Sequence, residues 1–403
     1  MLDQVTNESL TQTDAGTPMG DLMRRYWQPV GISEELPFGG EPRQIRVMGE
    51  DLVLFRDDQG EPGLLALHCS HRGTSLAYGR VEDGGIRCPF HGWLYDREGN
   101  VLEQPAELDG GAYRGHLRHP SYPCEELGGM IFAYLGPPEH KPLVPRYEVL
   151  VRKDGAPKVD YYHINSNFIQ NVEGALDTVH FSYLHMDRWS QVKHKLVDLP
   201  KPQLEFLESD YGIWQRACLP NVNSLTVDTV YAHFFMPAGF VRIQASGRPA
   251  DRGLVQKFYS WYVPADDTHT VRFQAAFSPP RHDGTPFAWP HQPEPFTPPG
   301  PENRYYRNYA GVDTISGIPV NAPGTAIKGY LCQDNMVNES QGPVVDREHE
   351  HLTPQDKVLM LMRQIYFKSV EEMRAGRDPK HILRNPADNN EYHVHGTEEI
   401  ELV

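Results

Sequence analysis

Residues 69–91 read CSHRGTSLAYGRVEDGGIRCPFH and contain two cysteine–histidine pairs, each within one short stretch. Cys69 and His71 form the first pair, Cys88 and His91 form the second, and sixteen residues separate His71 from Cys88. Two thiolates and two imidazoles are a ligand set for a metal. A structural zinc ion and an iron–sulfur cluster both fit this set. The spacing therefore predicts a metal centre and leaves its kind open between these two.

The residues around the two pairs favour an iron–sulfur cluster. The loops carry small or rigid residues, Gly73, Pro89 and Gly92, as expected where backbone N–H groups approach cluster sulfurs. From about residue 44 to residue 134, short apolar runs alternate with glycine and proline. This punctuation predicts short strands and a small antiparallel β domain around the metal centre.

A second group of ligand-type side chains lies in residues 171–185, NVEGALDTVHFSYLH. His180 and His185 are five residues apart, which is about 140° around a regular α-helix. They can bind one metal only if the helix is locally distorted, as helices often are at functional sites. Asp177 lies three residues before His180 and would share its helical face. Two imidazoles and a carboxylate with open positions describe a non-haem Fe(II) oxygenase site; the alternative is an ordinary helix that binds no metal.

Composition limits the classes of partner. The chain has 403 residues, a formal net charge of −16 and 39% hydrophobic residues, and it contains no apolar run of the roughly 20 residues that a membrane span needs. The negative charge argues against nucleic acid and anionic membranes as partners, and an anionic substrate would need a local cationic pocket. The polar N-terminus and the five dispersed cysteines predict a cytoplasmic protein.

The chain is long enough for two domains, and the fold class that we expect is α+β. Residues 18–30 predict a short helix that ends before Pro29. A proline-rich linker at 137–150 predicts domains over residues 1–146 and 147–403. In the second domain, alternating runs such as TVRFQAAFS predict a half-buried antiparallel sheet. A helix is expected over about 354–376, with Thr353 as its N-cap.

The spacing C-x-H-x16-C-x2-H, with HRG at the first pair and GW after the second, resembles the Rieske [2Fe–2S] signature. The resemblance implies that Cys69 and Cys88 bind one iron and that His71 and His91 bind the other.

A Rieske signature followed by D-x2-H-x4-H resembles the Rieske non-haem iron oxygenases over nearly the whole chain. The segments GTPMGDLMRRYWQPV, NVEGALDTVHFSYLH and ESQGPVVDREHEHLTPQDKVLM are similar to the phthalate-dioxygenase subgroup, which includes aromatic-acid dioxygenases and aryl-ether O-demethylases. The resemblance implies a catalytic domain of the helix-grip, START-like kind, with an antiparallel sheet and flanking helices, and a mononuclear Fe(II) as second cofactor.

The resemblance also assigns residues to the mononuclear site. His180 and His185 become the first two iron ligands, and Asp356, at the start of the last helix, becomes the third. Asp356 has an alternative role, because it follows Thr353 by three residues and could complete a capping arrangement. Further carboxylates close by are Asp346, Glu348 and Glu350.

Three residues of the 171–185 segment have expected roles next to the iron. By resemblance, Asp177 hydrogen-bonds an iron-ligating histidine and His91 of a neighbouring subunit; the alternative is a surface salt bridge. Asn171 resembles a family position near the iron. Glu173 is either a buried hydrogen-bond acceptor or a solvated helix residue.

Arg242 is the candidate for substrate binding. It is a cation in the otherwise apolar run HFFMPAGFVRIQ, and its position is similar to that of an arginine which binds the substrate carboxylate in the subgroup. The alternative is an arginine on the solvent face of a strand. Arg188 and Arg216 are the rival candidates.

The resemblance implies a terminal oxygenase component. A separate NAD(P)H-dependent flavin and iron–sulfur reductase would supply electrons, and an aromatic acid would be hydroxylated or O-demethylated with O₂. Subunits of one type would form a homotrimer or a stacked hexamer. Two alternatives remain: an oxygenase for alkylamines or sterols, and a Rieske electron-transfer protein whose second domain is inactive.

Overall fold

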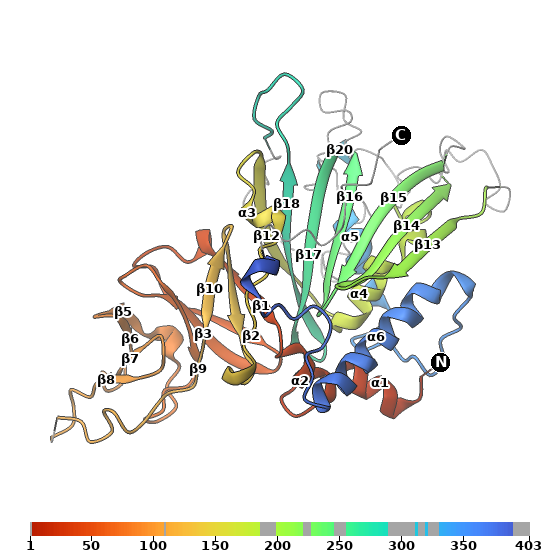
Figure 1. Cartoon of the computed structure of the whole chain (residues 1–403). Helices are drawn as coiled ribbons and strands as arrows, with labels where there is room; N and C mark the ends of the chain where they lie inside the picture. The colour runs from red at the N-terminus through yellow and green to blue at the C-terminus, as the bar shows by residue number, and fades with distance from the viewer. Residues whose placement is uncertain are drawn as a thin grey trace.

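The computed structural model describes residues 2–108, 110–185, 199–220, 227–245, 255–288, 311–312, 319–320 and 330–389. Arg188, one of the rival substrate cations, lies outside these residues. Within them, three small sheets lie to one side of a seven-stranded sheet (Figure 1). The α+β class and the two sheet-rich regions that the sequence predicts are confirmed.

The chain begins with two short helices, α1 (Gln4–Thr11) and α2 (Pro18–Met23). Thr17 caps α2, because its side chain accepts a hydrogen bond from the Gly20 backbone N–H, and Pro18 occupies the first helical position. The expected helix, which was to end just before Pro29, is therefore too long. Residues from Trp27 onward form a strand instead, and that strand contains Pro29.

The small sheets are all antiparallel and are built from short strands. The first has the order β1 (Trp27–Ile32), β11 (Met130–Tyr134), β10 (Cys124–Leu127). The second has the order β2 (Arg43–Val47), β3 (Glu50–Arg56), β4 (Pro62–Ala66), β9 (Ser121–Tyr122). The third has the order β5 (Arg80–Glu82), β6 (Gly85–Arg87), β7 (Leu94–Asp96), β8 (Val101–Glu103).

The large sheet is also antiparallel throughout. Its order is β12 (Ala156–Ile164), β18 (His269–Ser278), β17 (Val255–Asp266), β16 (Gly239–Ala245), β15 (Val227–Phe235), β14 (Gly212–Pro220), β13 (Gln203–Glu208). Val271 and Phe273 are buried as the alternation predicts, but Gln274 on the opposite face is only 4% exposed. The expectation of a half-buried sheet is wrong here, because helices cover the second face.

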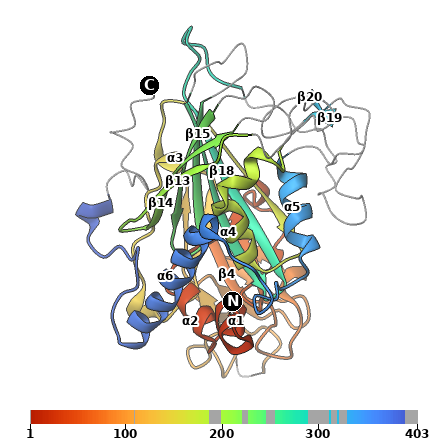
Figure 2. The same cartoon turned by 90° about the vertical axis from the view of Figure 1, so that its right-hand side faces the viewer.

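Three helices provide this cover: α4 (Phe168–Leu176), α5 (Tyr330–Ser340) and α6 (Lys357–Arg374). Figure 2 shows α4 between α5 and α6, in front of the large sheet. The remaining short elements are α3 (Glu148–Val151) and the pair β19 (Gly311–Val312) and β20 (Pro319–Val320). The expected C-terminal helix is present, and Thr353 caps the 3₁₀ turn at Pro354–Asp356 that leads into α6.

Two hydrophobic cores hold the described residues together. The larger core joins α1, α2, β1 and β11 to the large sheet and α6. The smaller core, which includes Phe55, Leu65, Trp93 and Tyr95, lies beside the cysteine–histidine loops. The division into residues 1–146 and 147–403 stays a prediction. Among the described helices, none is long and apolar enough to cross a membrane.

Candidate metal centres

The two cysteine–histidine pairs lie on two loops with the same backbone hydrogen bonds. The Cys69 N–H donates to the Thr74 carbonyl (2.9 Å), and the Cys88 N–H donates to the Trp93 carbonyl (2.8 Å). In each loop a glycine N–H closes the turn by donating to the cysteine carbonyl. Gly73 and Gly92 both have φ of +74°, a conformation that residues with a Cβ rarely adopt. The two loops therefore have matching turns, and each turn presents one cysteine and one histidine from the same small domain.

The four side chains fit a Rieske cluster. The Cys69 and Cys88 thiols are both 3% exposed. The ring centroids of His71 and His91 lie 4.6 Å apart. His91 Nδ1 is buried and has no hydrogen-bond partner among the described residues, as expected of an atom that binds a metal. Two thiolates on one side and two imidazoles on the other are the ligands of a Rieske [2Fe–2S] cluster.

Buried polar groups surround the first cluster loop. The Tyr95 hydroxyl lies 3.1 Å from Cys69 Sγ. Burial raises the pKa of Tyr95, so its hydroxyl keeps its proton and can donate to a thiolate. His119 lies behind this loop, with Nδ1 2.7 Å from Ser70 Oγ and Nε2 2.8 Å from the Ala66 carbonyl oxygen. These contacts fix the loop and supply a hydrogen bond to one cluster sulfur.

The second candidate centre forms where α4 ends. The chain leaves the α-helix at Leu176, Asp177 caps it, and a 3₁₀ segment follows over Thr178–Ser182. This is the local distortion that a five-residue histidine spacing requires. It brings His180 Nε2 to within 3.1 Å of His185 Nε2.

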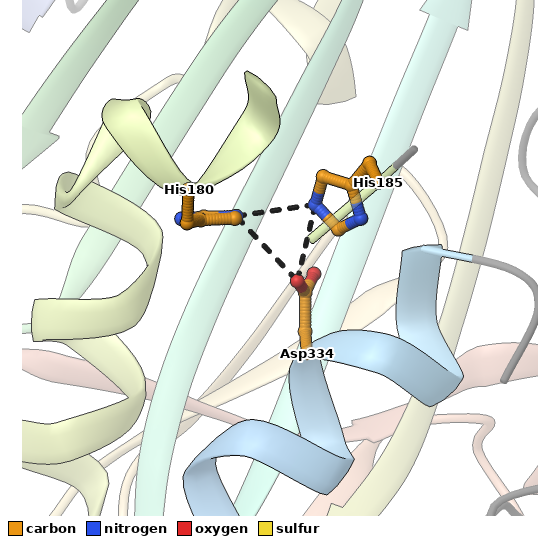
Figure 3. Close-up of side chains that lie close together, drawn as sticks. All are labelled: His180, His185 and Asp334. Atoms are coloured by element: carbon orange, nitrogen blue, oxygen red, sulfur yellow. Dashed lines mark hydrogen bonds and ion pairs between the residues drawn. The ribbon is translucent and has the colours of Figure 1, made fainter. Parts of the chain in front are cut away.

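A carboxylate of α5 completes the group. Asp334 Oδ1 lies 3.2 Å from His185 Nε2 and 3.6 Å from His180 Nε2 (Figure 3). A metal with bonds of about 2.1 Å at right angles places its ligand atoms roughly 3 Å apart. The three atoms therefore have the spacing of ligands to one ion, and this His–His–Asp group fits a mononuclear iron.

The structure does not bring Asp356 to the two histidines, which corrects the expected third ligand. Its Oδ2 accepts hydrogen bonds from the Thr353 backbone N–H (2.6 Å) and from Thr353 Oγ1 (2.9 Å). Asp356 thus has the capping role that the sequence left as the alternative. The physical reason is that α5, and not the start of α6, brings a carboxylate to the histidines. Asp334 is the only carboxylate between Asp313 and Glu339 in the sequence, and that isolation was the available signal.

Backbone and side-chain contacts orient both histidines. His185 Nδ1 donates to Gln333 Oε1 (2.8 Å), and His180 Nδ1 donates to the backbone carbonyl of Asp177. Each contact fixes the ring so that Nε2 points toward the other members of the His–His–Asp group. Burial lowers the pKa of His180 to about 4, so its imidazole is neutral and able to bind a metal. Gln333, next to Asp334, was not predicted from the sequence.

Asp177 lies beside the centre, but its carboxylate is not the group that contacts His180. The carboxylate accepts a hydrogen bond from the Val179 N–H (3.1 Å), and burial raises its pKa. It also lines a cavity of about 180 Å³ that His180 and Asp334 share. The contact with His91 of a neighbouring subunit stays a prediction.

Asn171 and Glu173 anchor α4. Asn171 Nδ2 donates to the Asn167 carbonyl (2.9 Å), and Asn171 Oδ1 accepts from Asn338 Nδ2 on α5 (3.0 Å). Glu173 is a buried acceptor, since Arg347 Nη2 and Arg363 Nη2 each lie 2.7 Å from its carboxylate. The alternative of a solvated Glu173 is therefore wrong.

Arg242 lies at the second centre and not on a solvent face. Its guanidinium carbon is 5.4 Å from the Phe181 ring centroid and 5.5 Å from that of Phe258. It lines a cavity of about 40 Å³ together with His180 and Asp334. Arg216, by contrast, is partly exposed and forms an ion pair with Glu205 (3.1 Å). Of the two described candidates, only Arg242 is placed to meet a substrate at the His–His–Asp group.

Comparisons with known proteins find a Rieske domain and relatives that are oxygenase subunits. Residues 26–120 match the model of the Rieske [2Fe-2S] domain family. The chain is 32% identical to the phenoxybenzoate dioxygenase subunit alpha of Ectopseudomonas oleovorans, over 94% of this chain and 88% of that protein. It is 30% identical to the 5,5'-dehydrodivanillate O-demethylase oxygenase subunit of a Sphingobium species, over 96% and 85%. The carbazole-bound oxygenase in the ferredoxin complex of carbazole 1,9a-dioxygenase superposes with a TM-score of 0.61 and 19% identity, over 97% and 100%.

Proposed function

The chain belongs to the Rieske non-haem iron oxygenases as an oxygenase component, and we propose that it hydroxylates or O-demethylates an aromatic carboxylate. Its cofactors are a Rieske [2Fe–2S] cluster and a mononuclear iron. Phenoxybenzoate and dehydrodivanillate, which name the substrates of two relatives, are both aromatic carboxylates. That shared chemistry supports the same substrate class here.

The observation that carries the substrate class is the position of Arg242. The Arg242 guanidinium lies next to the candidate iron ligands His180 and Asp334. Its positive charge locally offsets the net negative charge of the protein. The rings of Phe181 and Phe258 both lie against this guanidinium. A guanidinium can bind both oxygens of a carboxylate, and the aromatic walls suit a ring. The site therefore suits an aromatic acid better than an alkylamine or a sterol.

Each cofactor has a proposed set of residues. Cys69, Cys88, His71 and His91 would hold the cluster, and His180, His185 and Asp334 would hold the mononuclear iron. When bound, the cluster supplies electrons one at a time and the iron supplies the activation of O₂. Three protein ligands leave open positions at such an iron. The chain's own task is then to keep both histidines neutral and oriented and to hold the ring next to the open positions.

The partners form part of the same proposal. A separate NAD(P)H-dependent reductase would deliver the electrons, since one structural neighbour was solved with a ferredoxin. A trimer of identical subunits would place His91 of one subunit near Asp177 of the next. We also propose that the first domain, with the cluster, ends at residue 146 and that the second domain, with the mononuclear iron, begins at residue 147.

Turnover with a substrate panel tests the function. The holoenzyme, a reductase, NADH and O₂ would be incubated with methoxybenzoates and hydroxybenzoates, with their amides and methyl esters, and with an alkylamine and a sterol. We expect product from the acids, and formaldehyde in equal amount where a methoxy group is lost. Product from the alkylamine or the sterol, with none from any acid, would contradict the proposal.

The variant Arg242→Met tests the role of the cation. Loss of a charge-assisted contact of this kind costs on the order of 2–5 kcal/mol when the partner stays unpaired. KM should rise strongly for an acid and much less for its amide. An equal loss for both compounds would mean that Arg242 supports the fold and does not bind substrate.

A further inference from the structure

Two cavities flank the His–His–Asp group. The cavity of about 40 Å³ is lined by three phenylalanines and Arg242, and the cavity of about 180 Å³ lies beside α4 and α5. His180, Asp334 and Arg272 line both cavities. The two spaces are therefore adjoining parts of one chamber around the candidate iron site, and Arg272 lies at their boundary.

Gln274 presents an unsatisfied amide to this chamber. Its side chain is 4% exposed and lines the smaller cavity. The buried Oε1 has no hydrogen-bond partner among the described residues. Leaving such an acceptor unpaired is costly, so an unpaired buried amide oxygen that lines a cavity is a candidate partner for a bound ligand or water.

Arg272 supplies hydrogen-bond donors beside this acceptor. Its Nε and Nη2 lie 3.1 Å and 3.0 Å from Ser260 Oγ. The rings of Tyr162 and Tyr262 hold the guanidinium, each with its centroid 5.4 Å from the guanidinium carbon. A guanidinium carries five N–H groups, so donors remain for a ligand after the contacts with Ser260. Within the described part of the chain, no carboxylate forms an ion pair with Arg272 within 4 Å.

The strand register places Arg272 and Gln274 two strands away from Arg242. Arg242 lies opposite Phe258 of β17, Gln274 lies opposite Ser260, and Arg272 lies opposite Tyr262. Alternate residues of a strand share a face, so all three side chains enter the chamber from one face of the sheet. With β17 between β16 and β18 (Figure 1), the Cα atoms of Arg242 and Gln274 are roughly 12 Å apart by standard strand spacings. Arg242 and Gln274 therefore lie two strands apart on the same wall of the chamber.

We propose that Arg272 and Gln274 form a second polar anchor, which binds a ring hydroxyl of an aromatic acid whose carboxylate is held by Arg242. The hydroxyl would donate to Gln274 Oε1 and accept from an Arg272 N–H. The substrate class is then narrower: a hydroxylated aromatic carboxylate. This inference rests on the proposed function, because it takes the chamber as the aromatic-acid site.

Calorimetric titration of the anaerobic holoenzyme tests the second anchor. The probes are benzoate and the ortho, meta and para hydroxybenzoates. We expect at least one hydroxybenzoate to bind on the order of tenfold more tightly than benzoate, since a site built for a hydroxyl discriminates against the analogue without it. In Gln274→Leu the preference should disappear while benzoate binding is retained.

A matched control separates anchoring from general damage to the sheet. Gln256 is also a buried glutamine of this sheet, but it donates to Ser278 Oγ (3.4 Å) and does not line either cavity. Gln256→Leu should keep the hydroxyl preference. The visible spectrum of the cluster reports that each variant is folded.

The possible outcomes are distinct. If hydroxybenzoates bind no more tightly than benzoate, or if the preference survives in Gln274→Leu, the second anchor is refuted and the proposed function stands. If none of the four acids binds, the aromatic-acid substrate class is refuted, and the second anchor with it.

Discussion

The carboxylate of Asp334 lies far along the chain from the two histidines that it meets, yet their ligand atoms are 3.2 Å and 3.6 Å apart. Asp356 matched the expected sequence position better, but its carboxylate is engaged with Thr353. A carboxylate that caps a helix start already has its hydrogen bonds and is held away from the histidines. At the scale of single residues, the hydrogen bonds that a carboxylate makes to its neighbours decide whether it can bind the metal.

Substitution of Asp334 and of Asp356, each by asparagine, tests which of the two carboxylates is the third iron ligand. Asp334→Asn should lose most of the mononuclear iron, because an amide is a much weaker ligand than a carboxylate. Asp356→Asn should keep the iron and lose only helix-capping stability, on the order of 1 kcal/mol. Iron content per chain, measured next to the cluster spectrum, checks both variants. Retention of iron in Asp334→Asn together with its loss in Asp356→Asn would restore the original assignment.

The Tyr95 hydroxyl should tune the cluster. A hydrogen bond to a cluster sulfur favours the more negatively charged, reduced state. Tyr95→Phe removes a contact worth about 1 kcal/mol, so the reduction potential should fall by roughly 40 mV. Redox titration followed by electron paramagnetic resonance measures the shift.

Tyr134→Phe is the control for this measurement. Tyr134 is a buried tyrosine of β11 that donates to the Pro137 carbonyl (3.1 Å), and its loss should leave the potential unchanged. Equal potentials in wild type and Tyr95→Phe would show that the Tyr95–Cys69 contact does not affect the cluster.

Helix α4 is held by buried ion pairs in its second half, and its C-terminal end leads into the metal site. Glu173 joins it to Arg347 and Arg363, and Arg363 Nη2 also lies 2.9 Å from Glu350 on the segment before α6. The Arg347 side chain is fully buried. Removing one member of a buried ion-pair network leaves an uncompensated charge, which costs more than the pair contributed.

Glu173→Gln should therefore destabilise the protein by about 3–5 kcal/mol and lower iron occupancy, because α4 leads directly into the segment with His180. Denaturant unfolding and iron analysis measure the two effects. The control is Glu372→Gln on α6, which removes the partly exposed partner of Arg377, and its effect on both measurements should be small. Wild-type stability in Glu173→Gln would mean that the network does not hold α4.

At the scale of the whole molecule, the two metal centres need a route for electrons. Asp177 lies next to His180 and lines the larger cavity, but its carboxylate contacts only backbone N–H groups among the described residues. Its expected partner, His91 of a neighbouring subunit, would complete a bridge between the centres across a subunit boundary.

Asp177→Asn should keep both cofactors and slow electron passage from cluster to iron severely, because a neutral amide cannot hold two imidazoles as a carboxylate does. Single-turnover mixing of the reduced protein with substrate and O₂ measures this rate. The cluster potential should be unchanged. A wild-type rate would remove Asp177 from the route.

The sequence by itself determined both pairs of histidine and cysteine positions that depend on spacing within one loop or turn. The ligands of each cluster pair come from one tight turn, so the spacing of Cys69, His71, Cys88 and His91 was sufficient to predict the first centre. The spacing of His180 and His185 likewise required the helix distortion that the 3₁₀ segment provides.

Only the tertiary structure decided the contacts between distant segments. Residue spacing constrains positions within one turn or loop, but it does not say which helix packs against α4 or which face of β18 is covered. The packing of α5 beside α4 brought in Asp334 and Gln333. The sequence predicted a half-buried sheet, but α4 and α5 cover its second face, so Arg272 and Gln274 of β18 line the chamber and do not face open water.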